Sequence, residues 1–337
     1  MKDLLKRLIR AESTQDKGEL AAAEVVSSEF GRAGVESWVD CWDRSRANVT
    51  AHVESAAEKP CLLFACHLDV VGPGKASWNS PPFEPVEHDG RVYGRGATDM
   101  KGGTAAAIQA ICEVVADGVA LKGDIVFTAV AGEESDSCGA LRFVADCGWM
   151  SEPAGVIIPE PTGFDIVTAH RGMLWLQITT IGKAAHGSAP HLGINAISSM
   201  KSVLDELEKY RIHYEPHELL GDCSMSINTI AAGKEMNVIP DKCTLGIDIR
   251  TVPGQDNETI VGEIEQILGR LRQGSPTFDG NVSIVRQMLA METDSSSPFV
   301  QDFCSAVGIS ETKAVGFTTD GPHFAELGAP VLIFGPG

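Results

Sequence analysis

The chain has 337 residues, of which 43% are hydrophobic, and its formal net charge is −19. This length exceeds the usual size of one domain, so we expect two. The acidic balance and the lack of a basic stripe exclude nucleic acid as a partner, because phosphate binding needs clustered Lys and Arg.

The first ten residues are charged and amphipathic, so they lack the continuous apolar core and small-residue cleavage site of a secretory signal. No apolar run approaches the length of a membrane span, and no membrane partner is expected. The nine cysteines are scattered without CxxC pairs, which argues against a disulfide framework and a structural zinc knuckle. We therefore expect a cytoplasmic protein.

The first part of the chain alternates between predicted helices and strands. Residues 71–92 are rich in Pro, Gly and aromatic residues and are predicted to form a loop beside a pocket. The alternation predicts a doubly wound α/β domain. Helices are expected at 2–33, with a second segment from Gly18-Glu19, and at 104–119; strands are expected at 35–42, 47–53, 60–66, 125–131 and 156–159.

From Met173 the predicted order becomes β-α-β-β-α-β, which is the ferredoxin-like split unit. Its elements are expected at 173–181, 192–210, 224–231, 243–251, 257–272 and 282–289. Helices at 297–307 and 322–327 and strands at 313–317 and 330–334 then return to the first domain. The sequence thus predicts a discontinuous domain of residues 1–171 and 287–337 and an inserted domain of residues 172–286.

Acidic residues and one histidine follow the predicted strands where these strands end. His67 and Asp69 follow strand 60–66, and such a His can ligate a metal while the carboxylate orients its other nitrogen. Alone, this pair also fits a buried histidine with a satisfied hydrogen bond. Further acidic residues occupy similar places: Asp99 before helix 104–119, Glu133-Glu134 after strand 125–131, and Glu160 after strand 156–159.

The carboxyl ends of strands in open α/β sheets are where ligands bind, so we expect these side chains to share one pocket. One nitrogen and several carboxylate oxygens suit Zn²⁺, Co²⁺ or Mn²⁺ more than copper or an iron–sulfur cluster. Two metal ions that share a bridging carboxylate would need this many ligands. Taken alone, Glu133-Glu134 also fits a solvated acidic turn.

Eight spaced motifs extend along nearly the whole chain. They are His67-x-Asp69, Gly94-Arg-Gly-Ala-Thr-Asp99-Met-Lys-Gly-Gly103, Gly132-Glu133-Glu134, Pro159-Glu160-Pro-Thr162, Gly182-Lys-Ala-Ala-His186-Gly-Ser-Ala-Pro190, Asn237-Val-Ile-Pro240-Asp241, Asp248-Ile-Arg250-Thr-Val-Pro-Gly254 and Thr319-Asp320-Gly321. This series resembles the M20 metallopeptidases, especially the branch of acetylornithine deacetylases and succinyl-diaminopimelate desuccinylases. The resemblance implies a zinc-peptidase-like catalytic domain with an inserted lid domain that also forms a homodimer.

The resemblance also implies roles for individual residues. Asp99 would bridge two Zn²⁺ ions in each subunit, with Co²⁺ or Mn²⁺ as substitutes. His67 and Glu160 would complete the shell of one ion, and Glu134 would ligate the other. Glu133 would be the general base that contacts only water, and Asp69 would hold His67.

Further roles implied by the resemblance involve the inserted domain. His186 would stabilise the oxyanion across the dimer, and Arg250 would bind a substrate carboxylate. Asn237 and Gly321 would lie in substrate-side loops. From the residues alone, His186 also fits a structural histidine and Arg250 a surface ion pair.

The expected activity is metal-dependent removal of an N-acyl group, acetyl or succinyl, from an amino acid. The motif around His186 resembles that of the deacetylases, whereas Thr318-Thr319-Asp320-Gly321 resembles that of the desuccinylases. Two alternatives stay open. The protein could be a dipeptidase or carboxypeptidase of the same family that cleaves short peptides, or a homologue that binds a small ligand without catalysis.

The last part of the sequence departs from the family pattern. In the family, a final metal-ligating His follows a turn similar to Gly335-Pro336-Gly337, where this chain ends. We therefore expect that the sequence is truncated, that it binds one metal ion well and the second weakly, and that this form hydrolyses substrates slowly or not at all.

Overall fold

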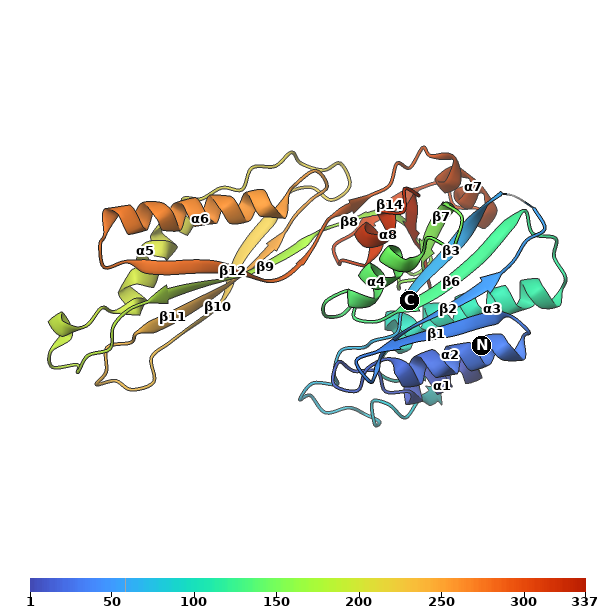
Figure 1. The fold of residues 1–337 in the computed structure, drawn as a ribbon, viewed down its shortest axis with the longest axis horizontal. Helices are drawn as coiled ribbons and strands as arrows, with labels where there is room; N and C mark the ends of the chain where they lie inside the picture. The colour runs from blue at the N-terminus through green and yellow to red at the C-terminus, as the bar shows by residue number, and fades with distance from the viewer. Residues whose placement is uncertain (58) are drawn as a thin grey trace. The chain divides into compact units, whose positions relative to one another are not determined.

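The computed structural model describes residues 1–57 and 59–337. They divide into two compact units (Figure 1). The first unit contains Met1–Thr168, Thr293–Ala314 and Thr319–Gly337, and the second contains Ala169–Glu292 and Val315–Thr318. The predicted domain boundaries at 171/172 and 286/287 stay a prediction.

The larger sheet has nine strands among the described residues, in the order β1-β2-β6-β3-β7-β15-β8-β13, with β14 beside β8. The neighbouring strands β6, β3, β7 and β15 are parallel, and the strands on either side of them are antiparallel. The carboxyl ends of β6, β3 and β7 therefore lie next to one another. The strands are β1 (Glu36–Trp42), β2 (Arg46–Val53), β3 (Lys59–His67), β6 (Gly123–Val130), β7 (Pro153–Ile158), β8 (Ile166–His170), β13 (Met291–Glu292), β14 (Thr312–Val315) and β15 (Val331–Ile333).

Helices cover both faces of this sheet (Figure 1). Five consecutive residues of β2, Ala47–Ala51, are buried, because α2 and α4 both pack against this strand. Helices α1 and α3 contact α2, and α3 also packs on β3 and β6. The helices of the first unit are α1 (Lys2–Arg10), α2 (Leu20–Arg32), α3 (Gly102–Ala116), α4 (Cys138–Asp146), α7 (Pro298–Val307) and α8 (Gly321–Ala325), with one irregular turn at Ala97–Lys101. This arrangement confirms the predicted α/β class.

The second unit has a four-stranded antiparallel sheet in the order β10-β11-β9-β12, with α5 and α6 packed against it (Figure 1). Its elements are β9 (Met173–Ile181), α5 (Ala196–Leu207), β10 (Ser224–Ala232), β11 (Lys242–Arg250), α6 (Asn257–Gly274) and β12 (Asp279–Met288), with a short 3₁₀ turn at Pro190–Leu192. The side chains of Asn195 and Asp256 cap α5 and α6 by accepting backbone N–H groups. This chain order is the predicted β-α-β-β-α-β order; the role of a lid stays a prediction.

The loop predicted at 71–92 is partly wrong, because it contains most of a β-hairpin of β4 (Val86–His88) and β5 (Arg91–Tyr93). Between these strands, Asp89 and Gly90 have φ values of 50° and 75°. Two consecutive positive φ angles are typical of the tight turn that Asp-Gly forms in hairpins. The helical region predicted at 2–33 forms two helices, since α1 ends at Arg10 and α2 begins at Leu20, directly after the predicted start of the second segment at Gly18-Glu19.

Candidate metal centre

The parallel strands bring the predicted acidic side chains to one edge of the sheet. His67 is the last residue of β3, and Glu160 follows β7 by two residues. Glu133 and Glu134 follow β6, which pairs with β3 on its other side. Residues far apart in the sequence thus meet where the chain leaves three adjacent strands.

His67, Asp99 and Glu160 form a cluster that could hold a metal ion. The His67 Nε2 atom lies 3.0 Å from Asp99 Oδ1 and 3.3 Å from Glu160 Oε1. One ligand atom from each residue can be chosen so that all three lie within 4.8 Å of one another. His67 and Glu160 are buried, whereas the Asp99 side chain is 56% exposed, which leaves one side of the cluster open to solvent.

Helix α3, which begins three residues after Asp99, closely approaches the segment that follows β7. A Cβ atom added to Gly103, in the first turn of α3, would lie only 1.8 Å from the carbonyl oxygen of Pro159. Glycine at this position therefore lets α3 begin directly beside Glu160. The peptide bond between Asp99 and Met100 is cis.

Asp69 contacts both His67 and the loop after β6. The Nδ1 atom of His67 lies 2.9 Å from the backbone carbonyl oxygen of Asp69 and 3.6 Å from its Oδ1 atom. Because a carbonyl only accepts, Nδ1 carries the hydrogen, and Nε2 can offer its lone pair to a cation.

The carboxylate of Asp69 accepts three backbone N–H groups in a row. Its Oδ1 atom accepts from Gly132 at 3.0 Å and from Glu133 at 3.1 Å, and its Oδ2 atom accepts from Glu134 at 2.9 Å. Asp69 thus holds His67 through its carbonyl and holds the backbone of the two glutamates through its carboxylate.

The electrostatics of the centre favour a bound cation. Burial raises the pKa of Glu133 well above its usual value. The charge of His67 lowers this pKa, whereas the charges of Asp320 and Glu160 raise it further. Burial likewise raises the pKa values of Glu160 and Glu134. Burial alone would lower the pKa of His67, but the charge of Glu160 raises it well above its usual value. Buried carboxylates with raised pKa values are stabilised in their charged form by a divalent ion, so these donors fit one.

Asp320 belongs to the same centre, although the sequence analysis selected its neighbour Gly321. A small buried cavity is lined by His67, Glu133, Glu160 and Asp320 among others. Both carboxylate oxygens of Asp320 are buried, and burial raises its pKa to about 7 although a side-chain interaction with Ser137 opposes this. The sequence feature that could have indicated Asp320 is its place as an acidic residue directly before the short helix α8. Gly321 is buried, begins α8 and donates its N–H to Thr319 Oγ1 at 3.0 Å.

Three other predicted residues, His186, Asn237 and Arg250, belong to the second unit. His186 Nδ1 lies 2.7 Å from Ser188 Oγ on an exposed loop, and the N–H of Gly187 donates to the Asn237 carbonyl at 2.7 Å. The structure therefore brings the loops of His186 and Asn237 side by side. Arg250 makes a two-pronged ion pair with Asp248, at 2.8 Å and 3.1 Å.

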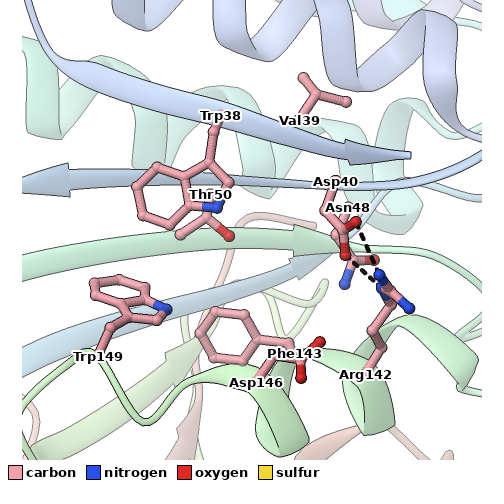
Figure 2. Close-up of a pocket in the computed structure, with 9 residues that line it drawn as sticks. All are labelled: Trp38, Val39, Asp40, Asn48, Thr50, Arg142, Phe143, Asp146 and Trp149. Atoms are coloured by element: carbon pink, nitrogen blue, oxygen red, sulfur yellow. Dashed lines mark hydrogen bonds and ion pairs between the residues drawn. The ribbon is translucent and has the colours of Figure 1, made fainter. Parts of the chain in front are cut away.

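A separate pocket of about 440 Å³ lies between β1, β2 and the region of α4 (Figure 2). Trp38 and Trp149 meet edge to face there with ring centroids 5.1 Å apart, and Arg142 pairs with Asp40. The buried Asn48 amide already donates to the carbonyl of Gly139 and accepts from Ala131 N–H. The residues that line this pocket include none of the predicted site residues, so we do not assign chemistry to it.

Solved structures define the class of this fold. It is similar to an M20 family metallo-carboxypeptidase from Sulfolobus solfataricus, with a TM-score of 0.81, 17% identity, and coverage of 99% of this chain and 90% of that one. It is also similar to a tripeptidase from Staphylococcus aureus, with a TM-score of 0.75, 20% identity, and coverage of 99% and 88%. At these identities the likeness shows the fold alone, and this fold is of the α/β class.

The model of Peptidase family M20/M25/M40 matches residues 63–337, and the chain belongs to this family. It is 30% identical over 359 residues to a probable succinyl-diaminopimelate desuccinylase of Staphylococcus epidermidis. This match covers 96% of this chain and 87% of the relative. It is 30% identical over 288 residues to an acetylornithine deacetylase of Myxococcus xanthus, covering 84% of this chain and 73% of the relative. The resemblance seen in the motifs is confirmed, and the protein is a hydrolytic enzyme. In the part of the chain that is described, no helix has the length and apolar character needed to cross a membrane.

Proposed function

We propose that the protein removes an acetyl or succinyl group from the nitrogen of an amino acid by hydrolysis. The observation that carries this proposal is the cluster of His67, Asp99 and Glu160, with Glu133 lining the same buried cavity as His67 and Glu160. The two relatives named above act on N-acylated amino acids by their names, which supports this class of substrate over free peptides.

The residues of the centre fit divalent metal ions. His67, Asp99 and Glu160 would hold one ion, and Asp99 with Glu134 would contribute to a second. We take Zn²⁺ as the first candidate, with Co²⁺ or Mn²⁺ as substitutes. When bound, such an ion supplies a Lewis acid that polarises the acyl carbonyl and lowers the pKa of a water molecule.

Glu133 is the proposed general base. Its side chain is buried, and its backbone is fixed by the carboxylate of Asp69 at 3.1 Å. Burial raises its pKa well above the usual value for Glu, so the carboxylate can accept a proton from the attacking water. The same proton then passes to the amine nitrogen that leaves when the C–N bond breaks.

Residues of the second unit complete the proposal. Arg250 would bind the substrate carboxylate with two N–H groups along the edge of its guanidinium group, in exchange for its present partner Asp248. His186 would stabilise the oxyanion from the partner subunit of a homodimer. Asn237 and Gly321 would line the substrate-side loops.

The second unit supports a homodimer through its edge strand. β10 lies at the edge of the four-stranded sheet, and eight of its nine side chains are exposed. Exposed edge strands present unpaired backbone groups and are usually covered in native proteins. A second copy of the same strand would cover this edge, which is why we propose the lid as the dimer contact.

A substrate panel tests the proposal. The protein is freed of metal with a chelator, reloaded with Zn²⁺ or Co²⁺, and assayed on acetylornithine, on succinyl-diaminopimelate and on unmodified dipeptides. We expect metal-dependent release of the acyl group, and the longer match to the desuccinylase favours succinyl. Hydrolysis of the dipeptides alone would replace this function with that of a peptidase. Metal binding without turnover of any substrate would favour a homologue that only binds a ligand.

A further inference from the structure

Lys101 is a buried lysine beside the proposed metal centre. It ends the irregular turn Ala97–Lys101, two residues after Asp99, and is 1% exposed. Its Nζ atom donates to the backbone carbonyls of Leu8 at 2.8 Å and Ala11 at 2.9 Å. A buried amino group is costly unless its hydrogens are accepted, and these two carbonyls accept them.

The two acceptors lie where α1 ends. Leu8 is in the last turn of α1, and Ala11 is its C-terminal cap. The last carbonyl groups of a helix lack partners within the helix and carry partial negative charge, which favours a cation. Lys101 therefore satisfies the end of α1 from inside the protein rather than from the surface.

The stem of Lys101 runs through a narrow space. A Cβ atom added to Gly96 would lie 3.2 Å from Cδ of Lys101 and 2.7 Å from a methyl group of Val70. Gly96 also has a φ of 80°, which favours glycine. A side chain at position 96 would thus collide with Val70 and crowd the stem of Lys101.

The chain after α1 holds the neighbouring site segment in the same way. The Ser13 hydroxyl donates to the carbonyl of Leu68 at 2.7 Å, and the N–H of Val70 donates to the carbonyl of Ser13 at 3.0 Å. Leu68 and Val70 flank Asp69. The end of α1 and the residue Ser13 therefore contact both segments that carry the proposed site residues.

We propose that Lys101 is a positioning residue, which fixes Asp99 in the metal centre by tying its turn to the end of α1. This inference rests on the proposed function only in taking Asp99 as a metal ligand. Residues that orient metal ligands without touching the metal typically change metal affinity roughly 10- to 100-fold when they are replaced.

The test measures metal binding rather than activity. Lys101→Met keeps the length of the stem and removes the ammonium group, and Ser13→Ala removes the hydroxyl contact with Leu68. Arg7→Gln is the matched control, because Arg7 also lies in the last turn of α1 but its side chain pairs with Glu29 of α2. Each full-length protein is loaded with Co²⁺; its visible absorption spectrum is recorded, and its affinity is measured by competition with a chelator.

We expect Lys101→Met to weaken Co²⁺ binding roughly 10- to 100-fold and to change the spectrum. Ser13→Ala should change the Co²⁺ affinity and the spectrum in the same direction as Lys101→Met, but by a smaller amount. Arg7→Gln should keep the parent's spectrum and affinity. Parent-like binding by a folded Lys101→Met protein would overturn the inference, as would an equal change in the Arg7 control. If Lys101→Met does not fold, Lys101→Gln is measured in the same way. Its shorter side chain should weaken Co²⁺ binding, and parent-like binding by this variant would overturn the inference.

The outcomes for the parent protein separate this inference from the proposed function. A parent that binds Co²⁺ and does not hydrolyse acylated amino acids would overturn the proposed function and leave the role of Lys101 intact. A parent that binds no Co²⁺ would overturn the metal centre and the positioning role together.

Discussion

Two adjacent glutamates after β6 occupy different surroundings. The Glu133 side chain is buried and lines the cavity that contains His67, whereas Glu134 is partly exposed. Asp69 holds the backbone of both at about the same distance, 3.1 Å and 2.9 Å. Consecutive side chains can therefore diverge from one fixed backbone, which supports separate roles for them.

The replacement Glu133→Gln should reduce turnover by roughly 10²- to 10⁴-fold, because a lost general base has effects of this size. The metal content should stay nearly unchanged, since this side chain is proposed to contact only water. The measurements are kcat and the metal bound per chain after dialysis. Glu134→Gln is the matched variant and should lose metal. Equal metal loss in the Glu133 variant would mean that the two roles are reversed.

His170 gives the second unit a dependence on pH. It is fully buried, its Nδ1 atom lies 2.8 Å from the carbonyl of Arg171, and burial lowers its pKa to about 4. An unfolded His has a pKa near 6.5, so the unfolded chain takes up the proton first as the pH falls. The stability that neutral His170 contributes is thus complete above about pH 6.5 and is lost between about pH 6.5 and about pH 4.

We therefore expect the free energy of unfolding to fall by about 1 kcal/mol for each pH unit in this window because of His170 alone. Denaturant unfolding of the parent and of His170→Gln at about pH 7.5 and about pH 5.5 measures this contribution by difference. The difference in the free energy of unfolding between the parent and the variant should be smaller at the lower pH. A difference that stays constant would show that His170 has the same pKa in the folded and the unfolded chain.

Single residues were predictable where a motif and a strand end coincided. His67 and Glu160 follow apolar runs in the sequence and Asp99 precedes a predicted helix, and the structure brings their side chains together. Asp320 was missed because its surroundings come from other segments, including β3 and the loop after β6. The contacts of Lys101 were not predictable either, because its acceptors are the backbone carbonyls of Leu8 and Ala11, which lie far from Lys101 in the sequence.

At the scale of elements, the alternating pattern of β9 predicted its bounds correctly as Met173–Ile181. Strand β8, Ile166–His170, was missed because all five residues are buried and the segment does not alternate. Helix α4 was missed because it is short and begins with Cys138-Gly139. A Cβ atom added to Gly139 would lie 2.2 Å from the backbone nitrogen of Ala131, so tertiary contact rather than helix propensity selects this glycine.

The edge strand β10 supplies a test of the proposed homodimer. Ile230 lies on β10 and is 57% exposed, so Ile230→Lys should leave the fold of one chain intact and place a charge where two edges would meet. Val285→Lys is the matched control on β12, the opposite edge of the sheet, where Val285 is 62% exposed. Sedimentation at micromolar concentration should show a dimer for the parent and the control and a monomer for Ile230→Lys. A fully active parent monomer would leave His186 without its proposed role.

At the scale of the whole molecule, the first unit concentrates buried negative charge around His67. Burial raises the pKa values of Glu133, Glu160 and Asp320, so their ionised forms are unfavourable without a cation. A metal ion that binds only the folded state should raise stability by about 2.7 kcal/mol when its free concentration is 100 times its dissociation constant.

Removal of the metal should therefore lower the melting temperature of the protein. The measurement compares the chelator-treated protein before and after Zn²⁺ is restored, with Mg²⁺ added at the same concentration as a control for ionic strength. The shift should be reversed by Zn²⁺ and not by Mg²⁺, because a site with a histidine nitrogen suits zinc better. An unchanged melting temperature would contradict metal binding at this centre.

The order of strands in the large sheet has a consequence for how the protein is made. β15, residues Val331–Ile333, lies between β7 and β8, although both of those strands come much earlier in the chain. While the ribosome is still adding the residues before 331, β7 has no neighbour on that side. The four strands of the second unit, by contrast, are complete by Met288. The second unit can thus fold during synthesis, while β7, the strand before Glu160, waits for its partner strand and needs protection from aggregation.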